Sequence, residues 1–194
     1  MLRRTMAVAL ALSFALVAAS AVAQPCMVGV YADAEATRGT MVPGLDPNNP
    51  VLPVIKDVYV VAFVEDVMDA MAYKLVNPDP ATALEASALY GPSGLGINIA
   101  TPGGSNVGLG ECAVGFGGQP IVIAHYEYLF FPEFPGGEFC LEVNVDQDPS
   151  TDPTKAQYST CQSELKPCDI GPCLLVEPPI ATDSVSFGSI KALF

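Results

Sequence analysis

A two-residue alternation of apolar side chains, interrupted at short intervals by proline and glycine, constrains the fold of this chain more than any other feature. In the segment 138–146, Phe139 and Leu141 alternate with polar neighbours, which is typical of a strand with one face in the core and one in water. The segment 121–131 is more continuously apolar, which predicts a central strand. Breaks such as 132–137 (PEFPGG) are typical of turns. The chain is therefore expected to be mainly β.

Further segments of this kind extend the prediction to an antiparallel β-sandwich, with a small β-barrel as the alternative. The predicted strands are 27–32, 54–64, 96–100, 107–116, 121–131 and 138–146, and a hairpin turning at Glu65-Asp66 adds a strand that ends at Val76. One short helix is predicted at 79–89, because Asp79-Pro80 offers a cap and a first-turn proline before good helix formers. Over residues 26–146 the pattern is similar to that of secreted bacterial immunoglobulin-like or cohesin-like modules, a resemblance of architecture.

The N-terminus has the three parts of a secretory signal peptide. Arg3 and Arg4 precede an apolar run at 6–19, and Ala21-Val22-Ala23 is a small-x-small cleavage sequence. The apolar run is shorter than the roughly 20 residues that a membrane-spanning helix needs. We predict removal of residues 1–23 and export to the periplasm, the cell surface or the extracellular space. Residues 24–176 are then expected to form the sandwich domain.

The remaining residues, 177–194, are predicted to be a C-terminal tail, because Pro178-Pro179 forms a stiff break in the chain. The last twelve residues, 183–194, are short and amphipathic. They are expected either to dock on the domain or to act as an interaction or sorting element.

The charge of the chain excludes one class of partner. It has 8 basic and 21 acidic residues and a net charge of -13, which becomes -15 once Arg3 and Arg4 leave with the signal peptide. Nucleic-acid binding requires clustered Lys and Arg that this chain lacks. Cations suit this field, and anionic membrane surfaces do not.

Six cysteines lie in the exported part, an even number that predicts three disulfides in an oxidising compartment. They are Cys26, Cys112, Cys140, Cys161, Cys168 and Cys173. One bridge is expected between Cys112 and Cys140, which both lie in predicted strands. At least one local bridge is expected among the last three cysteines. A zinc site is disfavoured, because the Cys168-x4-Cys173 spacing stands alone beside a single histidine.

No catalytic residue is assigned from the sequence. The single histidine, His125, lies in an apolar strand and is interpreted as a structural residue of the sheet. Ser93 lies in GPSGLG, which lacks the spacing of a nucleophile elbow, and the glycines at 91–118 match no nucleotide-binding motif. Tyr126 and Tyr128 share one face of their strand and are expected in the core, with a binding surface as the alternative, while His125 and Glu127 point the other way.

Acidic loops are the remaining candidates for chemistry. Asn144, Asp146, Asp148 and Asp152, in NVDQDPSTD, offer the oxygen ligands that Ca²⁺ requires, although the spacing lacks the glycine and glutamate of an EF-hand. The alternative is a solvated loop in which these side chains cap their own turns. A second, weaker acidic group is 46–49. Apart from calcium, no cofactor is predicted.

These features together predict a binding or structural module of the envelope or extracellular space, which recognises a protein or a surface ligand. The alternative from a different class is a small secreted hydrolase that uses paired carboxylates. The absence of Trp argues modestly against work on carbohydrate.

Overall fold

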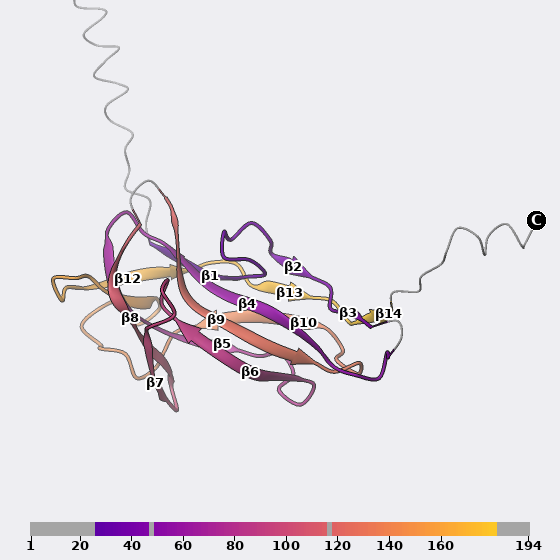
Figure 1. The fold of residues 1–194 in the computed structure, drawn as a ribbon. Coiled ribbons are helices and arrows are strands. Elements are labelled where there is room, and N and C mark those ends of the chain that lie inside the picture. Colours follow the sequence, from indigo (N-terminus) through magenta and orange to yellow (C-terminus); the bar gives the residue numbers. More distant parts are fainter. Residues whose placement is uncertain (1–25, 47–48, 116–117, 182–194) are drawn as a thin grey trace, which may run out of the picture.

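The computed structural model describes residues 26–46, 49–115 and 118–181, in which the regular structure is all β (Figure 1). The strands are β1 (Met27–Tyr31), β2 (Thr40–Met41), β3 (Gly44–Leu45), β4 (Val54–Phe63), β5 (Val67–Val76), β6 (Ala83–Tyr90), β7 (Ile97–Thr101), β8 (Gly104–Val114), β9 (Pro120–Phe130), β10 (Gly137–Glu142), β11 (Ala156–Ser159), β12 (Leu165–Ile170), β13 (Leu174–Val176) and β14 (Ile180–Ala181). Within these ranges no helix is long and apolar enough to cross a membrane.

Two facing sheets make up the body of the fold. The β9 sheet has the order β6-β9-β4-β1-β12, and the β5 sheet contains β7-β8-β5, then β10, β13 and β2. Strand β11 pairs with both β5 and β12 and so joins the two sheets along one side. The path from β2 to β6 has two free ends, so the structure is an open sandwich and the closed-barrel alternative is wrong. The pairs are antiparallel except β1–β12, β13–β2 and β14–β3.

The core between the sheets is built from the inward positions of the alternating strands. Tyr128 of β9 and Phe139 of β10 have ring centroids 4.8 Å apart. The buried hydroxyls of Tyr73 in β5 and Tyr126 in β9 lie 2.8 Å apart, which joins the two sheets across the core. Burial of Tyr126 and Tyr128 confirms their predicted place in the core.

The local alternation located most long strands correctly. The expected hairpin at Glu65-Asp66 is confirmed, because β4 ends at Phe63 and β5 begins at Val67. The strand predicted at 138–146 is shorter, since β10 ends at Glu142 and the chain then turns.

The predicted helix at 79–89 is wrong. Asp79 does form the expected local bonds, accepting from the Ala81 backbone N–H and the Thr82 hydroxyl. From Ala83, however, the chain continues as β6, which pairs with β9 along its length. The exposed edge of β9 offers backbone hydrogen bonds to this segment, and that tertiary pairing overrides a weak local helix propensity.

The cysteines form three disulfides, as predicted, but both expected pairings are wrong. The bridges are Cys26–Cys168, Cys112–Cys161 and Cys140–Cys173, separated by 142, 49 and 33 residues. Cys112 and Cys140 therefore do not bond to each other, and the last three cysteines form no local bridge. The partners are brought together by the packing of distant strands, which spacing along the sequence does not report.

The predicted signal peptide and the amphipathic end at 183–194 lie outside the described residues. The beginning of the predicted tail is described, and Ile180–Ala181 forms β14, paired in parallel with β3 at one end of the molecule (Figure 1).

Candidate docking face

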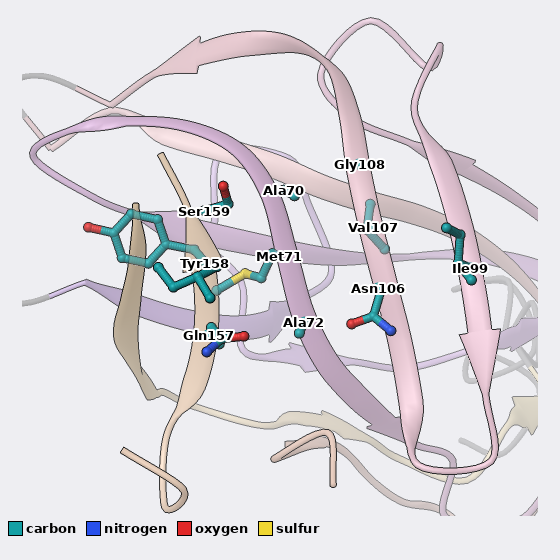
Figure 2. A pocket seen from close by; sticks show the side chains of 11 residues that line it. Ala70, Met71, Ala72, Ile99, Asn106, Val107, Gly108, Gln157, Tyr158 and Ser159 are labelled. Carbon is teal, nitrogen blue, oxygen red and sulfur yellow. The ribbon is translucent and has the colours of Figure 1, made fainter. Parts of the chain in front are cut away.

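The outer face of the β5 sheet carries a shallow apolar groove of about 300 Å³ (Figure 2). Its floor consists of small side chains on neighbouring strands. Ala70 of β5 lies opposite Gly108 of β8 on one side and Ser159 of β11 on the other. Because the intervening residues Met71 and Tyr158 belong to the buried set, the floor is formed by the outward half of the alternation.

Large apolar side chains form the two rims of this groove. Ile99 on β7, directly opposite Asn106, lines the groove and is 66% exposed. Ile97, opposite Gly108 on the same face of β7, lies just beyond the lining and is 69% exposed. Leu165, opposite Ser159 at the start of β12, is 41% exposed on the other side. Branched side chains flanking a floor of small residues create a hollow on a sheet face that is otherwise open to water.

Polar contacts close one end of the groove. The buried side chain of Gln157 in β11 accepts a hydrogen bond from the Asp148 backbone N–H and donates to the Asp148 carbonyl and the Thr151 hydroxyl. Fully buried Asn144 donates to the Ser105 carbonyl and to the Asn106 side chain. These bonds hold the acidic loop 144–152 against the end of the groove.

The four predicted calcium ligands all lie in this loop, and each accepts a backbone N–H. The bonds are Asn144 Oδ1 from Asp146 at 2.9 Å, Asp146 Oδ2 from Gly103 at 2.9 Å, Asp148 Oδ1 from Ser150 at 2.8 Å and Asp152 Oδ1 from Thr154 at 2.9 Å. Three of them are the short-range turn bonds of the solvated-loop alternative, and that of Asp146 reaches the β7–β8 turn. Calcium binding here stays a prediction.

Those bonds also set the charge of the loop. The hydrogen bonds from Ser150 lower the pKa of the Asp148 carboxyl, and those from Thr154 lower the pKa of the Asp152 carboxyl. Both groups are therefore ionised at neutral pH. In the second acidic group, at 46–49, Pro47 and Asn48 lie outside the described residues.

Next to the rim residue Leu165 in β12, Lys166 is bound by acidic side chains. Its Nζ lies 2.5 Å from Asp66 Oδ2 and 3.6 Å from Glu164 Oε2. Because this lysine is shared between two carboxylates, the chain next to Leu165 carries net negative charge. The groove itself has no charged residue in its lining, and these carboxylates lie outside it.

One group in the described part of the chain brings three metal-ligating side chains together, namely Glu138, Cys140 and Cys173. Its two sulfur atoms are joined in a disulfide and are therefore not thiolate ligands.

His125 lies on the outer face of the β9 sheet. Its Nε2 is 2.7 Å from Asp57 Oδ1, and its ring stacks on Tyr59 with centroids 4.5 Å apart. Neighbouring Glu127 accepts a hydrogen bond from the Ser87 hydroxyl. The expectation that His125 and Glu127 point away from the core is confirmed.

The hydrolase alternative requires a carboxyl that stays protonated near neutral pH beside a second, ionised one. Glu85 is the described carboxyl whose pKa is clearly raised, by desolvation. It lines a cleft whose other lining residues include Lys74 and Tyr128 but no second acid. The described structure therefore gives no support to paired-carboxylate catalysis.

Sequence reasoning missed the docking face altogether. Its floor residues, Ala70, Gly108 and Ser159, carry no chemical motif. The available signal was the pair Ile97 and Ile99, which alternate with small or polar residues in a short strand bounded by glycine and proline.

No family model and no curated protein sequence matches this chain. Among solved structures, it is similar in fold to CaCohA2 from Clostridium acetobutylicum, with 11% identity, a TM-score of 0.44 and coverage of 81% of this chain and 92% of that chain. The seventh ScaB type I cohesin from Pseudobacteroides cellulosolvens has 12% identity and a TM-score of 0.47, with coverage of 83% of this chain and 96% of that chain. A non-cellulosomal cohesin from the archaeon Archaeoglobus fulgidus has 8% identity and a TM-score of 0.41, with coverage of 81% of this chain and 94% of that chain. At these identities no residue role transfers to this chain.

Proposed function

We propose that this chain is a secreted protein-binding module whose docking face is the groove on the β5 sheet. The partner presents an apolar segment flanked by lysine or arginine residues. The observation that carries the proposal is the exposure of Ile99 and Leu165 on either side of a floor of small residues. A sheet face exposed only to water gains nothing from such a hollow, whereas a partner side chain that fills it removes apolar surface from water on both sides.

The charge around the groove favours a basic partner. Asp146 and Asp148 have no ion pair in the described part of the chain and lie in the loop that is bonded to the lining residue Gln157. Asp66 and Glu164 share Lys166, the neighbour of Leu165. With a net charge of -13 for the whole chain, this field attracts cationic segments and accelerates their association. It also disfavours a second copy of the same chain as the occupant.

Export is supported by two independent features. The N-terminal sequence has the parts of a signal peptide, and all six cysteines are paired in disulfides. Disulfides of this kind persist in oxidising compartments such as the periplasm and the extracellular space.

A peptide-display selection on the disulfide-bonded protein tests the proposal. Selected peptides are expected to combine apolar side chains with flanking Lys or Arg. Gly108→Arg fills the groove and adds a charge that repels such peptides. A Cβ atom at Gly108 meets nothing closer than the Ile97 carbonyl oxygen at 3.9 Å, so this site has room for a side chain at its base.

The expected result is at least about a tenfold loss of peptide affinity in Gly108→Arg, measured by fluorescence anisotropy. The matched control is Ile55→Arg, which adds the same charge at an exposed position of the β9 sheet and is expected to leave affinity unchanged. Equal binding by wild type and Gly108→Arg, or peptides without basic residues, would contradict the proposal.

A further inference from the structure

A second concave site lies on the open side of the sandwich, where β6 of one sheet and the β7–β8 hairpin of the other come together without a shared ladder. This cleft has a volume of about 420 Å³ and is lined from both sheets. The β9 sheet contributes Glu85, Tyr90 and Tyr128, and the β5 sheet contributes Asn98 and Ser105, among others. The size is that of a pocket for one small molecule.

Hydrogen-bonding groups dominate the cleft and are already ordered. Asn98 Nδ2 donates to the Tyr90 hydroxyl at 3.1 Å and to Ser105 Oγ at 3.2 Å. Lys74 is held by Glu142 at 2.8 Å, so its charge is balanced outside the cleft. These bonds fix the lining before any ligand binds, which lowers the entropy cost of recognition.

Besides the buried Asn98 Oδ1, two polar groups of the lining have no partner in the described part of the chain. These are the Glu85 carboxylate and the Tyr128 hydroxyl, one from each of two neighbouring strands of the β9 sheet. Glu85 Oε atoms accept hydrogen bonds, and the Tyr128 hydroxyl can donate one and accept another. The half-buried ring of Tyr90, edge-on to Tyr126, supplies apolar surface beside them.

We propose that this cleft binds a neutral, polyhydroxylated small molecule of the size of a monosaccharide. Sugar hydroxyls both donate and accept, which matches a lining of hydroxyl, amide and carboxylate groups. An inorganic anion would be repelled by Glu85, and an apolar ligand would leave these polar groups desolvated without partners. The half-buried ring of Tyr90 provides aromatic surface in a chain that has no Trp.

The cleft is separate from the docking groove, although one hairpin contributes to both. Ile99 and Gly108 face the groove, whereas Asn98 and Ser105 lie on the opposite face of the β7–β8 hairpin and line the cleft. Substitution of the groove at Gly108 is therefore expected to leave sugar binding unchanged. The two proposals can fail independently.

Titration of the ¹⁵N-labelled protein with the methyl glycosides of glucose, galactose, mannose and N-acetylglucosamine tests this site by NMR. At least one glycoside is expected to bind in the millimolar range and to shift the side-chain amide resonance of Asn98. Tyr128→Phe and Glu85→Gln each remove one hydrogen-bonding group, which is expected to weaken binding roughly fivefold.

Matched controls carry the same chemical changes elsewhere. Tyr31→Phe alters a buried tyrosine and Glu138→Gln an exposed glutamate, and neither residue lines the cleft. Both are expected to bind the glycoside as wild type does. Absence of binding by all four glycosides, equal weakening in the controls, or shifts produced by choline chloride but not by sugars would overturn the proposal.

Discussion

The two sheets present outer faces of different relief, although both faces carry exposed apolar side chains. On the β9 sheet, outward side chains pair across strands, as Asp57 does with His125 at 2.7 Å and Ser87 with Glu127 at 2.6 Å. Such cross-strand polar pairs suit a surface that stays solvated. The same face also exposes Ile55, Leu84 and Leu89, at 57%, 42% and 53%.

The β5 sheet places alanine, glycine and serine at the corresponding outward positions. Ala70, Ala72 and Gly108 form a hollow, and Ile97 and Ile99 stand exposed beside it. Because the register is the same kind of antiparallel ladder in both sheets, the difference comes from side chains and not from backbone geometry. The β5 face is therefore distinguished by its groove of small side chains and not by apolar exposure as such.

The largest expected effect is the loss of unfolding free energy when a disulfide is removed, and its size differs between the two sheets. Cys26–Cys168 joins β1 to β12 in the β9 sheet, and removing it by double substitution to Ser should cost about 5 kcal/mol of unfolding free energy in the loop-entropy model. Cys112–Cys161 joins β8 to the chain after β11, on either side of β5, and its removal should cost about 4 kcal/mol. Urea unfolding measures both values.

The Cys112–Cys161 variant should weaken peptide binding more than the Cys26–Cys168 variant, because its bridge ties β8 to the chain after β11 across the floor of the groove, whereas Cys168 lies in β12, which contributes only the rim residue Leu165. Equal loss of affinity in both variants, measured under conditions where each is folded, would show that the two faces do not differ in this way.

The next largest expected effect is stabilisation of the folded protein by calcium. An ion bound in the loop 144–152 would distinguish the β5 sheet further from the β9 sheet. If the loop binds Ca²⁺, a hundredfold excess over Kd should stabilise the protein by about 2.7 kcal/mol, and EDTA should remove that gain. Thermal unfolding measures the shift, and Asp148→Asn should reduce it. An unchanged Tm in both Ca²⁺ and EDTA would exclude the site.

The tyrosines between the sheets test whether the two faces belong to one cooperative unit. Burial raises the pKa of Tyr73, Tyr126 and Tyr128. Above about pH 10 the unfolded chain loses protons that the folded protein keeps, so stability is complete below that pH and falls as pH rises. Each tyrosine should contribute a slope of about 1.4 kcal/mol per pH unit.

Urea unfolding between about pH 9 and pH 11 measures this slope. Tyr128→Phe should make the slope shallower by about 1.4 kcal/mol per pH unit, whereas a slope unchanged by this substitution would contradict the raised pKa of Tyr128.

Exposed ion pairs should give the smallest effect on either face. The hydrogen bond from Lys166, aided by the Val67 N–H, lowers the pKa of Asp66. Its contribution is therefore present above the ordinary carboxyl pKa and is lost as pH falls through the lower folded value. Asp66→Asn on the β5 sheet and Asp57→Asn on the β9 sheet should each lower Tm by no more than about 2–4 °C, measured by calorimetry.

The confirmed strands are those whose signal was local. Alternation at 121–131 and 54–64 places one face in the core whatever the rest of the chain does, so β9 and β4 were predicted close to their observed bounds. The segment 83–90 failed because its alanines are compatible with either helix or strand, and its pairing with β9 decided the outcome. A propensity read from neighbours along the chain cannot include a partner strand that lies about forty residues away.

The sequence by itself determined the β class, the acidic charge and the presence of three disulfides, because these follow from local alternation and from residue counts. Only the tertiary structure decided which cysteines pair, and that Ala70 lies between Gly108 and Ser159 beneath the isoleucines of β7. Those neighbours come from strands far apart in the chain. Their register is fixed by how the inward side chains pack in the common core, a condition that no short stretch of sequence contains.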